Sequence, residues 1–183
     1  MWLLEAFLRA GVKDAIAGVI FDPELAREAH SQGIGARFQA RFNRDGGDAF
    51  SKPVTLPAMV QALRRASVRG RRGIFAGSTV RLGPSTALDL GGITVVVVSN
   101  RVQCADPIFL EAFGLDIGRA RVVIVKSRGH FRGGFDEFFS HEQVIEVDAP
   151  GLTSPILSRF EWKYLPRPVL PIDDHAEWDA NAA

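Results

Sequence analysis

The run Ile93–Ser99 (ITVVVVS) limits the possible folds more than any other stretch of this chain. Its residues are apolar on both faces of an extended strand, which predicts a strand covered on both sides, as in parallel sheets. Asp14–Ile20 (DAIAGVI) and Arg121–Ser127 (RVVIVKS) have the same character, and Asp106–Gly114 (DPIFLEAFG) between the two later strands predicts a short helix. Alternating strands and helices predict right-handed crossovers and an α/β fold.

Two helices are predicted near the start of the chain. Leu3–Leu8 has apolar residues at helical spacing, with Gly11 as a C-terminal stop. Asp22 stands where an N-cap belongs and Pro23 where the first helical residue belongs. The segment that follows predicts an amphipathic helix ending at Gly33.

The second half predicts a further helix and strand. Phe131–Phe139 (FRGGFDEFF) is predicted to be a short helix, and Gln143–Gly151 (QVIEVDAPG) a parallel strand, the third after Gly91. Pro150 and the residues after it hold five of the ten prolines. We therefore expect an extended, wrapping tail whose last residues, 175–183, are frayed.

Residues 34–90 have a different residue pattern, with β-rich segments broken by Gly and Pro. Apolar and polar residues alternate imperfectly in these segments, which is typical of antiparallel strands with one solvent-exposed face. Pro57–Ser67 (PAMVQALRRAS) is also compatible with a helix. We predict an α/β fold with a three-layer-like parallel or mixed sheet, flanking helices and an inserted antiparallel β-rich lobe. The expected boundaries describe one domain over 1–183: an α/β part at about 1–33 and 91–150, the lobe at about 34–90 and a Pro-rich tail at 151–183.

Composition narrows the class of protein. With 46% hydrophobic residues, 23% charged residues and a net charge of +1, the chain has the composition of a soluble globular protein. The single cysteine, Cys104, excludes an intrachain disulfide and fits a reducing cytoplasm. The longest apolar run is far short of the ~20 residues that a membrane helix needs, and Met1–Ala10 lacks the pattern of an export signal. We expect a cytoplasmic protein without a membrane segment.

Five arginines lie between Arg64 and Arg72 (RRASVRGRR). Such a cluster would suit phosphate contacts. No interleaved aromatic residues or nucleic-acid motif accompany it, so a solvated hairpin or loop is the favoured interpretation. We expect no nucleic-acid partner.

Polar residues follow each predicted parallel strand. Because ligands of open α/β sheets bind outside the carboxyl ends of the strands, these residues predict a polar crevice. Its cations, carboxylates, hydroxyls and imidazole would suit a ligand that carries a carboxylate or phosphate. The candidates are Phe21, Asp22, Ser99, Asn100, Arg101, Lys126, Ser127, His130 and Asp148.

Each candidate also has a structural interpretation. His130 has the pKa range of a general base, but a histidine at the start of a helix more often anchors a loop. Lys126 is more often a solvated or salt-bridged edge residue. Arg101, Gln103 and Asp106 could form an internally paired loop, with Asp106 as the N-cap of the next helix. For Asp148 the two interpretations are evenly balanced.

The histidines do not form a recognisable metal motif. His30 lies in a predicted helix, His175 in the tail, and His130 and His141 are eleven residues apart. No HExxH or His-x-His pair is present, and neither a GxSxG serine elbow nor a dinucleotide fingerprint occurs. We expect no catalytic metal site within this chain.

Several separate stretches together resemble one known family. In chain order they read FDPELAREAHSQGIGA, LGPSTALDLGGITVVVVSNRVQCADPIFLEAFGLD, RVVIVKSRGHFRGGF and VDAPGLTSPILSRFEWKYLPRPVLPID. They resemble the C-terminal domain of the MlrC (microcystinase C) family of metallopeptidases, from about Leu3 to Asp173 and most loosely between Arg44 and Arg72. The matching landmarks are Arg101, Gln103, Asp106, Lys126, Ser127, His130, Phe131, Asp148, Pro150 and Gly151.

The resemblance implies a two-domain enzyme whose N-terminal domain binds zinc through His and acidic ligands and hydrolyses an amide bond. The sequence matches the second domain, and a family segment of the form Asp-Asn-Pro-Gly-Gly-Gly would precede Met1. No position matches a catalytic ligand. We therefore expect no cofactor in this chain, with zinc held by the N-terminal domain. The substrate-binding candidates are Arg101, Gln103, Lys126, Ser127, His130 and Asp148.

Three hypotheses follow. The first is a non-catalytic, substrate-positioning or structural part of a metallopeptidase, partnered by a separately encoded or lost N-terminal metal domain and able to bind an acidic peptide. The second is a stand-alone module that binds a small ligand or associates with itself. The third, ranked last, is an independent hydrolase that uses His130, Lys126 and Asp148. An apolar surface that normally packs on another domain should be exposed.

Overall fold

The computed structural model describes residues 1–46, 52–65, 67–127, 129–149, 156–170 and 172–173. The chain divides into two units, Met1–Val147 and Asp148–Ala183. The first unit contains every strand described below, and the second contains the 3₁₀ helix η4, Leu157–Arg159. The domain boundaries expected from the sequence stay a prediction.

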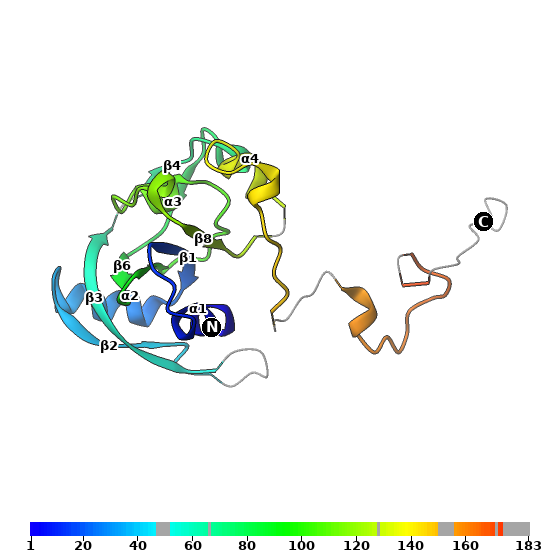
Figure 1. Ribbon diagram of the computed structural model, residues 1–183, viewed down its shortest axis with the longest axis horizontal. Helices are drawn as coiled ribbons and strands as arrows, with labels where there is room; N and C mark the ends of the chain where they lie inside the picture. The colour runs from blue at the N-terminus through cyan, green and yellow to red at the C-terminus, as the bar shows by residue number, and fades with distance from the viewer. Residues whose placement is uncertain (47–51, 66, 128, 150–155, 171, 174–183) are drawn as a thin grey trace. The chain divides into compact units, whose positions relative to one another are not determined.

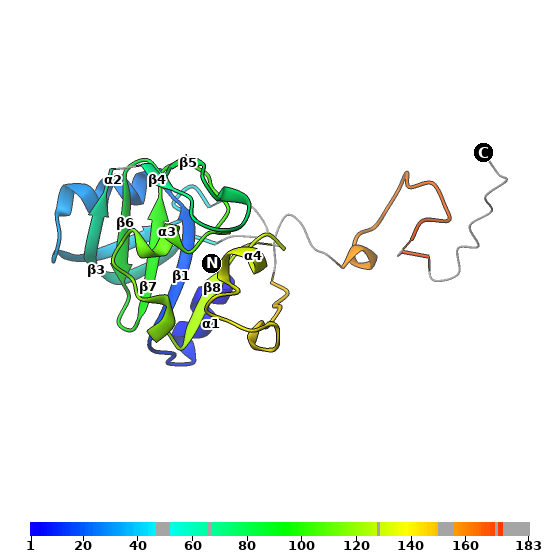
Figure 2. The same cartoon turned by 90° about the horizontal axis from the view of Figure 1, so that it is seen from above.

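A six-stranded mixed sheet forms the centre of the first unit, in the order β2-β3-β6-β7-β1-β8 (Figures 1 and 2). Strand β1 pairs in parallel with β7 on one side and β8 on the other, whereas β2, β3 and β6 pair in antiparallel fashion. A second, two-stranded sheet pairs β4 with β5. The bounds are β1 Ala15–Phe21, β2 Arg37–Phe42, β3 Val54–Arg64, β4 Ser67–Arg69, β5 Thr79–Arg81, β6 Ser85–Asp89, β7 Ile93–Val98 and β8 Val122–Val125.

Helices cover both faces of the sheet. The bounds are α1 Trp2–Arg9, α2 Pro23–Gln32, η1 Gly73–Phe75, α3 Ile108–Glu111, η2 Ile117–Arg119, α4 Arg132–Phe135 and η3 His141–Gln143. On β7, Val95 and Val97 pack in the core layer of α1 and α2, while Val96 and Val98 pack in the layer of α3 and α4. Burying both faces explains the unbroken run of valines, since each fully buried valine contributes about 1.5–3 kcal/mol. The α/β class predicted from this run is confirmed.

The helix α2 forms as its sequence predicts. The side chain of Asp22 accepts a hydrogen bond from the backbone N–H of Leu25 at 2.9 Å, Pro23 opens the helix, and Gly33 closes it with a φ of 85°. Because few residues other than glycine adopt this φ, the helix has a defined end.

Close packing between α3 and β1 depends on a glycine. A Cβ atom on Gly18 would lie 2.6 Å from Cδ2 of Leu110, which is fully buried. The helix that connects β7 with β8 can therefore approach the sheet closely at this point.

The segments at 34–90 are continuous with the main sheet. Strands β2, β3 and β6 extend it as an antiparallel half, and the small β4–β5 sheet stands apart in the hydrogen-bonding pattern. The alternative of a helix at Pro57–Ser67 is wrong, because β3 runs to Arg64 with a register shift between Val60 and Ala62.

The prediction of a parallel strand at Gln143–Gly151 is also wrong over the described part of that segment. The chain makes the 3₁₀ turn η3, capped by reciprocal hydrogen bonds between Ser140 and Gln143, and residues up to Ala149 form no strand. Ile145 is 83% exposed. Alternating apolar residues can satisfy the strand pattern without finding a neighbouring strand, as occurs here.

No helix in the described part of the chain is long and apolar enough to cross a membrane.

Candidate functional site

The carboxyl ends of the three parallel strands meet at one edge of the sheet. Phe21 at the end of β1 pairs in register with Val98 at the end of β7, and Gly18 pairs with Val125 at the end of β8. The segments after β7 and β8 therefore leave the sheet at the same edge. The sequence predicted a polar crevice here.

Three polar side chains from these segments form a hydrogen-bonded chain, which we call the strand-end cluster: Gln103, Ser127 and His130. Nε2 of Gln103 donates to Oγ of Ser127 at 2.7 Å, and Oε1 of Gln103 lies 3.1 Å from Nδ1 of His130. An amide oxygen only accepts hydrogen bonds, so Nδ1 of His130 carries a proton in this arrangement. In the neutral ring, Nε2 then has a free lone pair.

The strand-end cluster retains unused hydrogen-bonding groups. His130 is exposed, Ser127 is half-buried, and the Ser127 hydroxyl that accepts from Gln103 can still donate its own proton. The cluster can therefore offer one acceptor, at His130, and one donor, at Ser127, to a bound group.

Arg101 lies at the same edge. Its guanidinium carbon is 4.1 Å from the centre of the Phe21 ring, which is 38% exposed. This cation–π contact is worth about 0.5–1 kcal/mol at an exposed site and orients the guanidinium. Among the described residues Arg101 has no ion-pair partner, so its charge is available to an anion.

Lys126 follows β8 directly and is exposed. It too makes no ion pair within the ranges that the structure describes. The salt-bridged interpretation of Lys126 therefore has no support here, whereas the solvated one and the ligand-binding one stay open.

Asp106 has a structural position. Its side chain is fully buried, and Oδ2 accepts from the backbone N–H groups of Arg71 at 2.7 Å and Arg72 at 2.9 Å. Oδ1 accepts from the N–H of Ile108 at 2.9 Å, at the start of α3. Pro107 occupies the N-cap position of α3 in place of the expected Asp106, whose carboxylate still accepts from the first N–H of the helix. The expected pairing within one loop is wrong for Arg101 and Gln103, whose partners come from other segments.

An ion-pair network, which sequence reasoning missed, surrounds Asp106. Arg71 makes a two-pronged contact to Glu111, with atom separations of 2.8 and 2.6 Å, and also pairs with Glu137. Arg72 pairs with Asp136 at 2.5 Å. We call these five residues the arginine network. It attaches the loop after β4 to α3 and α4.

The charges of the arginine network support one another. The hydrogen bonds that Arg71 donates to Glu137, and then those to Glu111, raise the pKa of Arg71. The hydrogen bond from Arg71 in turn lowers the pKa of Glu137. Two of the five clustered arginines are therefore paired with carboxylates, which the interpretation as a solvated hairpin or loop did not include.

Other predicted residues serve the scaffold. Besides capping α2, the Asp22 carboxylate accepts from the N–H of Asn43 at 3.2 Å. The side chain of Asn100 donates to the carbonyl of Arg81 at 3.0 Å. Their hydrogen-bonding groups are used within the protein.

Asp148 does not lie at a strand end, because the residues that lead directly to it, 144–147, form no strand. Its carboxylate pairs with Arg159 inside the second unit. Pro150 and Gly151, which the resemblance also named, lie outside the described residues. Contact between Asp148 and a ligand stays a prediction.

The donor set at the strand ends does not fit a zinc site. Its members are an amide, a hydroxyl and an imidazole, whereas protein zinc sites use Cys, His, Asp and Glu. Over the described ranges, no three side chains of those types come together. His30 contacts the carbonyl of Ser85 at 3.1 Å, and burial raises the pKa of the Cys104 thiol to about 12, which leaves it protonated at neutral pH.

Comparisons with known proteins agree with the architecture. A family model described as MlrC C-terminus matches residues 1–164. The crystal structure of a "putative metallopeptidase" from Mesorhizobium sp. BNC1 superposes with a TM-score of 0.70 and 27% sequence identity. The match covers 92% of this chain and 33% of the Mesorhizobium chain, so this chain spans about a third of that protein. No curated protein matches.

Proposed function

Since this chain belongs to the MlrC C-terminal family, we propose that it is the substrate-positioning part of an amide-hydrolysing metallopeptidase and is not catalytic alone. The zinc would be bound by an N-terminal domain that is separately encoded, lost or part of a longer chain. The name of the Mesorhizobium protein and its greater length support this proposal.

The observation that carries the proposal is the strand-end cluster. In it, Gln103 fixes His130 and Ser127 in one geometry, so that each can bind a substrate group without first being ordered. Nε2 of His130 would accept a hydrogen bond from a peptide N–H, and the Ser127 hydroxyl would donate to a peptide carbonyl. Arg101 and Lys126 would attract a carboxylate, which suits an acidic peptide.

An independent hydrolase is less well supported. A histidine base usually takes its orientation from a carboxylate, whereas His130 is held by an amide and Asp148 pairs with Arg159. Zinc-assisted hydrolysis needs three protein ligands around an open position, and the strand-end cluster does not offer that donor set. Positioning is the chemistry that this donor set can perform.

The second candidate is a stand-alone module that binds a ligand or associates with itself. Exposed apolar side chains on the first unit favour it: Ile34 is 70% exposed and Ile74 is 52% exposed. Sedimentation velocity over a wide concentration range would support this candidate if dimers form, and a clean monomer would count against self-association.

Titration with a short peptide of Glu and Ala tests the positioning proposal. We expect Arg101→Ala and Lys126→Ala each to weaken binding about ten-fold, at low salt, without changing the melting temperature. Arg119→Ala is the matched control, because Arg119 is an exposed arginine in η2, which precedes β8 and so lies away from its carboxyl end. If all three variants lost the same affinity for the peptide, binding would depend only on the net charge of the protein, which would contradict the proposal.

A further inference from the structure

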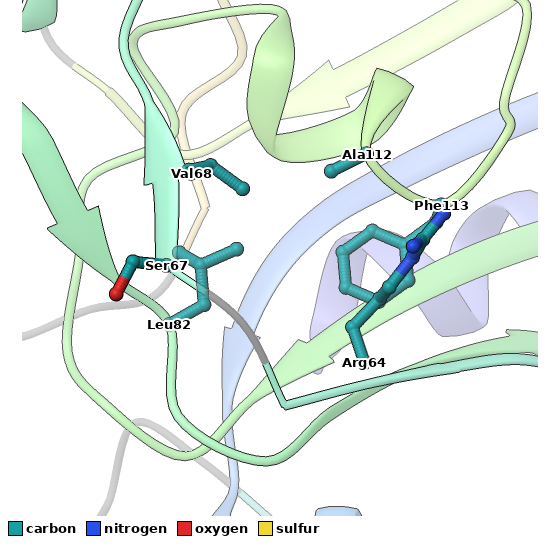
Figure 3. A pocket seen from close by; sticks show the side chains of 6 residues that line it. All are labelled: Arg64, Ser67, Val68, Leu82, Ala112 and Phe113. Atoms are coloured by element: carbon teal, nitrogen blue, oxygen red, sulfur yellow. The ribbon is translucent and has the colours of Figure 1, made fainter.

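A hollow that shares no lining residue with the strand-end cluster lies between the end of β3, strand β4 and the end of α3. Its volume is about 200 Å³. In Figure 3, Ser67, Val68 and Leu82 lie on one side of it and Arg64, Ala112 and Phe113 on the other. Leu82 and Phe113 are 1% and 5% exposed, so the floor is part of the rigid core.

The lining combines an apolar floor with a cation at its edge. Val68, Leu82, Ala112 and Phe113 supply the apolar surface, and the hydroxyl of Ser67 points away from the hollow in Figure 3. Arg64 is exposed, and in the parts of the chain that are described it forms no ion pair. This separates Arg64 from Arg71 and Arg72, whose charges are met by carboxylates.

The neighbouring small sheet adds positive charge. In the β4–β5 register, Ser67 faces Arg81 and Arg69 faces Thr79, so Arg69 and Arg81 share one face as diagonal neighbours. The opposite face carries Val68 and Val80, which pack into the core. Arg69 and Arg81 therefore lie on the face away from Val68, and Arg64 is the cation in the lining of the hollow.

We propose that this hollow binds a small ligand with an apolar body and one carboxylate. The body would lie against Val68 and Ala112, above the buried Leu82 and Phe113, and the carboxylate would accept hydrogen bonds from Arg64. A cavity of 150 Å³ can hold benzene, so a ring with a short acid side arm is of suitable size here. The ligand is either a free hydrophobic acid or the C-terminal residue of a peptide. This proposal does not depend on the positioning function.

Amide chemical-shift titration of the purified chain with 3-phenylpropionate tests it. We expect saturable shifts at Val68, Ala112 and Phe113, and none with phenethylamine, which has the same ring and the opposite charge. Absence of saturation with the acid, or equal binding of the amine, would overturn the proposal. A peptide that ends in Phe with a free carboxylate is compared with 3-phenylpropionate and with the same peptide in amidated form. Tighter binding of the free-carboxylate peptide than of both others identifies a peptide terminus as the ligand. Tighter binding of 3-phenylpropionate than of the peptide identifies a free acid.

Variants test the geometry. Arg64→Gln should weaken binding of 3-phenylpropionate about ten-fold, whereas Arg65→Gln, at the exposed neighbouring arginine, should change it less than about two-fold. Ala112→Leu should abolish binding by filling the hollow while circular dichroism shows that the chain is still folded. Equal effects of the two arginine variants, or unchanged binding in Ala112→Leu, would place the ligand elsewhere and contradict the proposal.

Discussion

The arginine network and the strand-end cluster lie on either side of one short segment, Gln103–Asp106, yet they differ in how completely their polar groups are used. The Asp106 carboxylate accepts hydrogen bonds from three backbone N–H groups. The arginine network around it pairs two arginines with three carboxylates. Gln103 holds an exposed histidine and a half-buried serine, each with an unused group. Nε of Arg72 is buried without a hydrogen-bond partner among the described residues, but the carboxylates around it are used within the fold, whereas the strand-end cluster keeps exposed groups that are available to a ligand.

The largest expected effect is at Asp106. We expect Asp106→Ala to lower the free energy of unfolding by about 3–5 kcal/mol, because it leaves three N–H groups without their acceptor in a buried site. Asp116→Ala, at an exposed aspartate in the same region, should cost less than about 0.5 kcal/mol. Urea unfolding of both variants measures the difference in the free energy of unfolding. Similar values would contradict the claim that the hydrogen bonds to Asp106 hold the fold together.

A neighbouring pair of glycines gives the next effect. A Cβ on Gly134 would lie 2.3 Å from the carbonyl oxygen of Ala105, whereas a Cβ on Gly133 would meet nothing closer than 4.0 Å. We expect Gly134→Ala to cost about 1–3 kcal/mol, since backbone must move, and Gly133→Ala to be close to neutral. Thermal unfolding distinguishes them. If the two variants were equally stable, α4 would not be held tightly against Ala105.

Acid should weaken the arginine network. Because the pKa of Glu137 is lowered in the folded protein, its contribution to stability is present above the unfolded pKa and is lost as the pH falls through the folded pKa. Glu137→Gln should therefore lower the melting temperature at pH 7, and this difference should shrink as the pH falls below the ordinary pKa of a glutamate. Melting curves of both proteins from neutral to acid pH test the sign, and a difference that stays constant or grows toward acid pH would contradict it.

The smallest effect on stability, with a clear effect on binding, is expected in the strand-end cluster. His130→Ala removes one exposed hydrogen bond and should change the free energy of unfolding by less than about 0.5 kcal/mol. Binding of the Glu and Ala peptide should nevertheless fall several-fold. His141→Ala, at another exposed histidine, is the control for both measurements. If His130→Ala lost stability and kept its binding, His130 would be a loop anchor.

The sequence predicted the parts of the fold that depend on local chemistry. The cap at Asp22, the stop at Gly33 and the buried run of β7 act through neighbouring residues or through burial on both faces, and all three are confirmed. The prediction of a strand at Gln143–Gly151 was wrong because an alternation of apolar residues does not reveal whether a partner strand is within reach. Ile145 has the pattern of a strand residue and lies in solvent.

The candidate site was predictable only in part. Strand ends converge in any parallel sheet, so the edge that carries Ser127 and His130 could be anticipated. The contact between Gln103 and His130 joins residues 27 apart, and that between Arg71 and Glu137 joins residues 66 apart. Such pairings depend on the path of the loops, which composition and periodicity do not describe.

The zinc content of the purified, tag-free chain after dialysis against trace zinc tests the central claim most directly. The account predicts no stoichiometric metal, because the strand-end cluster does not offer the ligands that zinc requires. About one zinc per chain, lost on His130→Ala or His141→Ala, would contradict it and make this chain a candidate metalloenzyme in its own right.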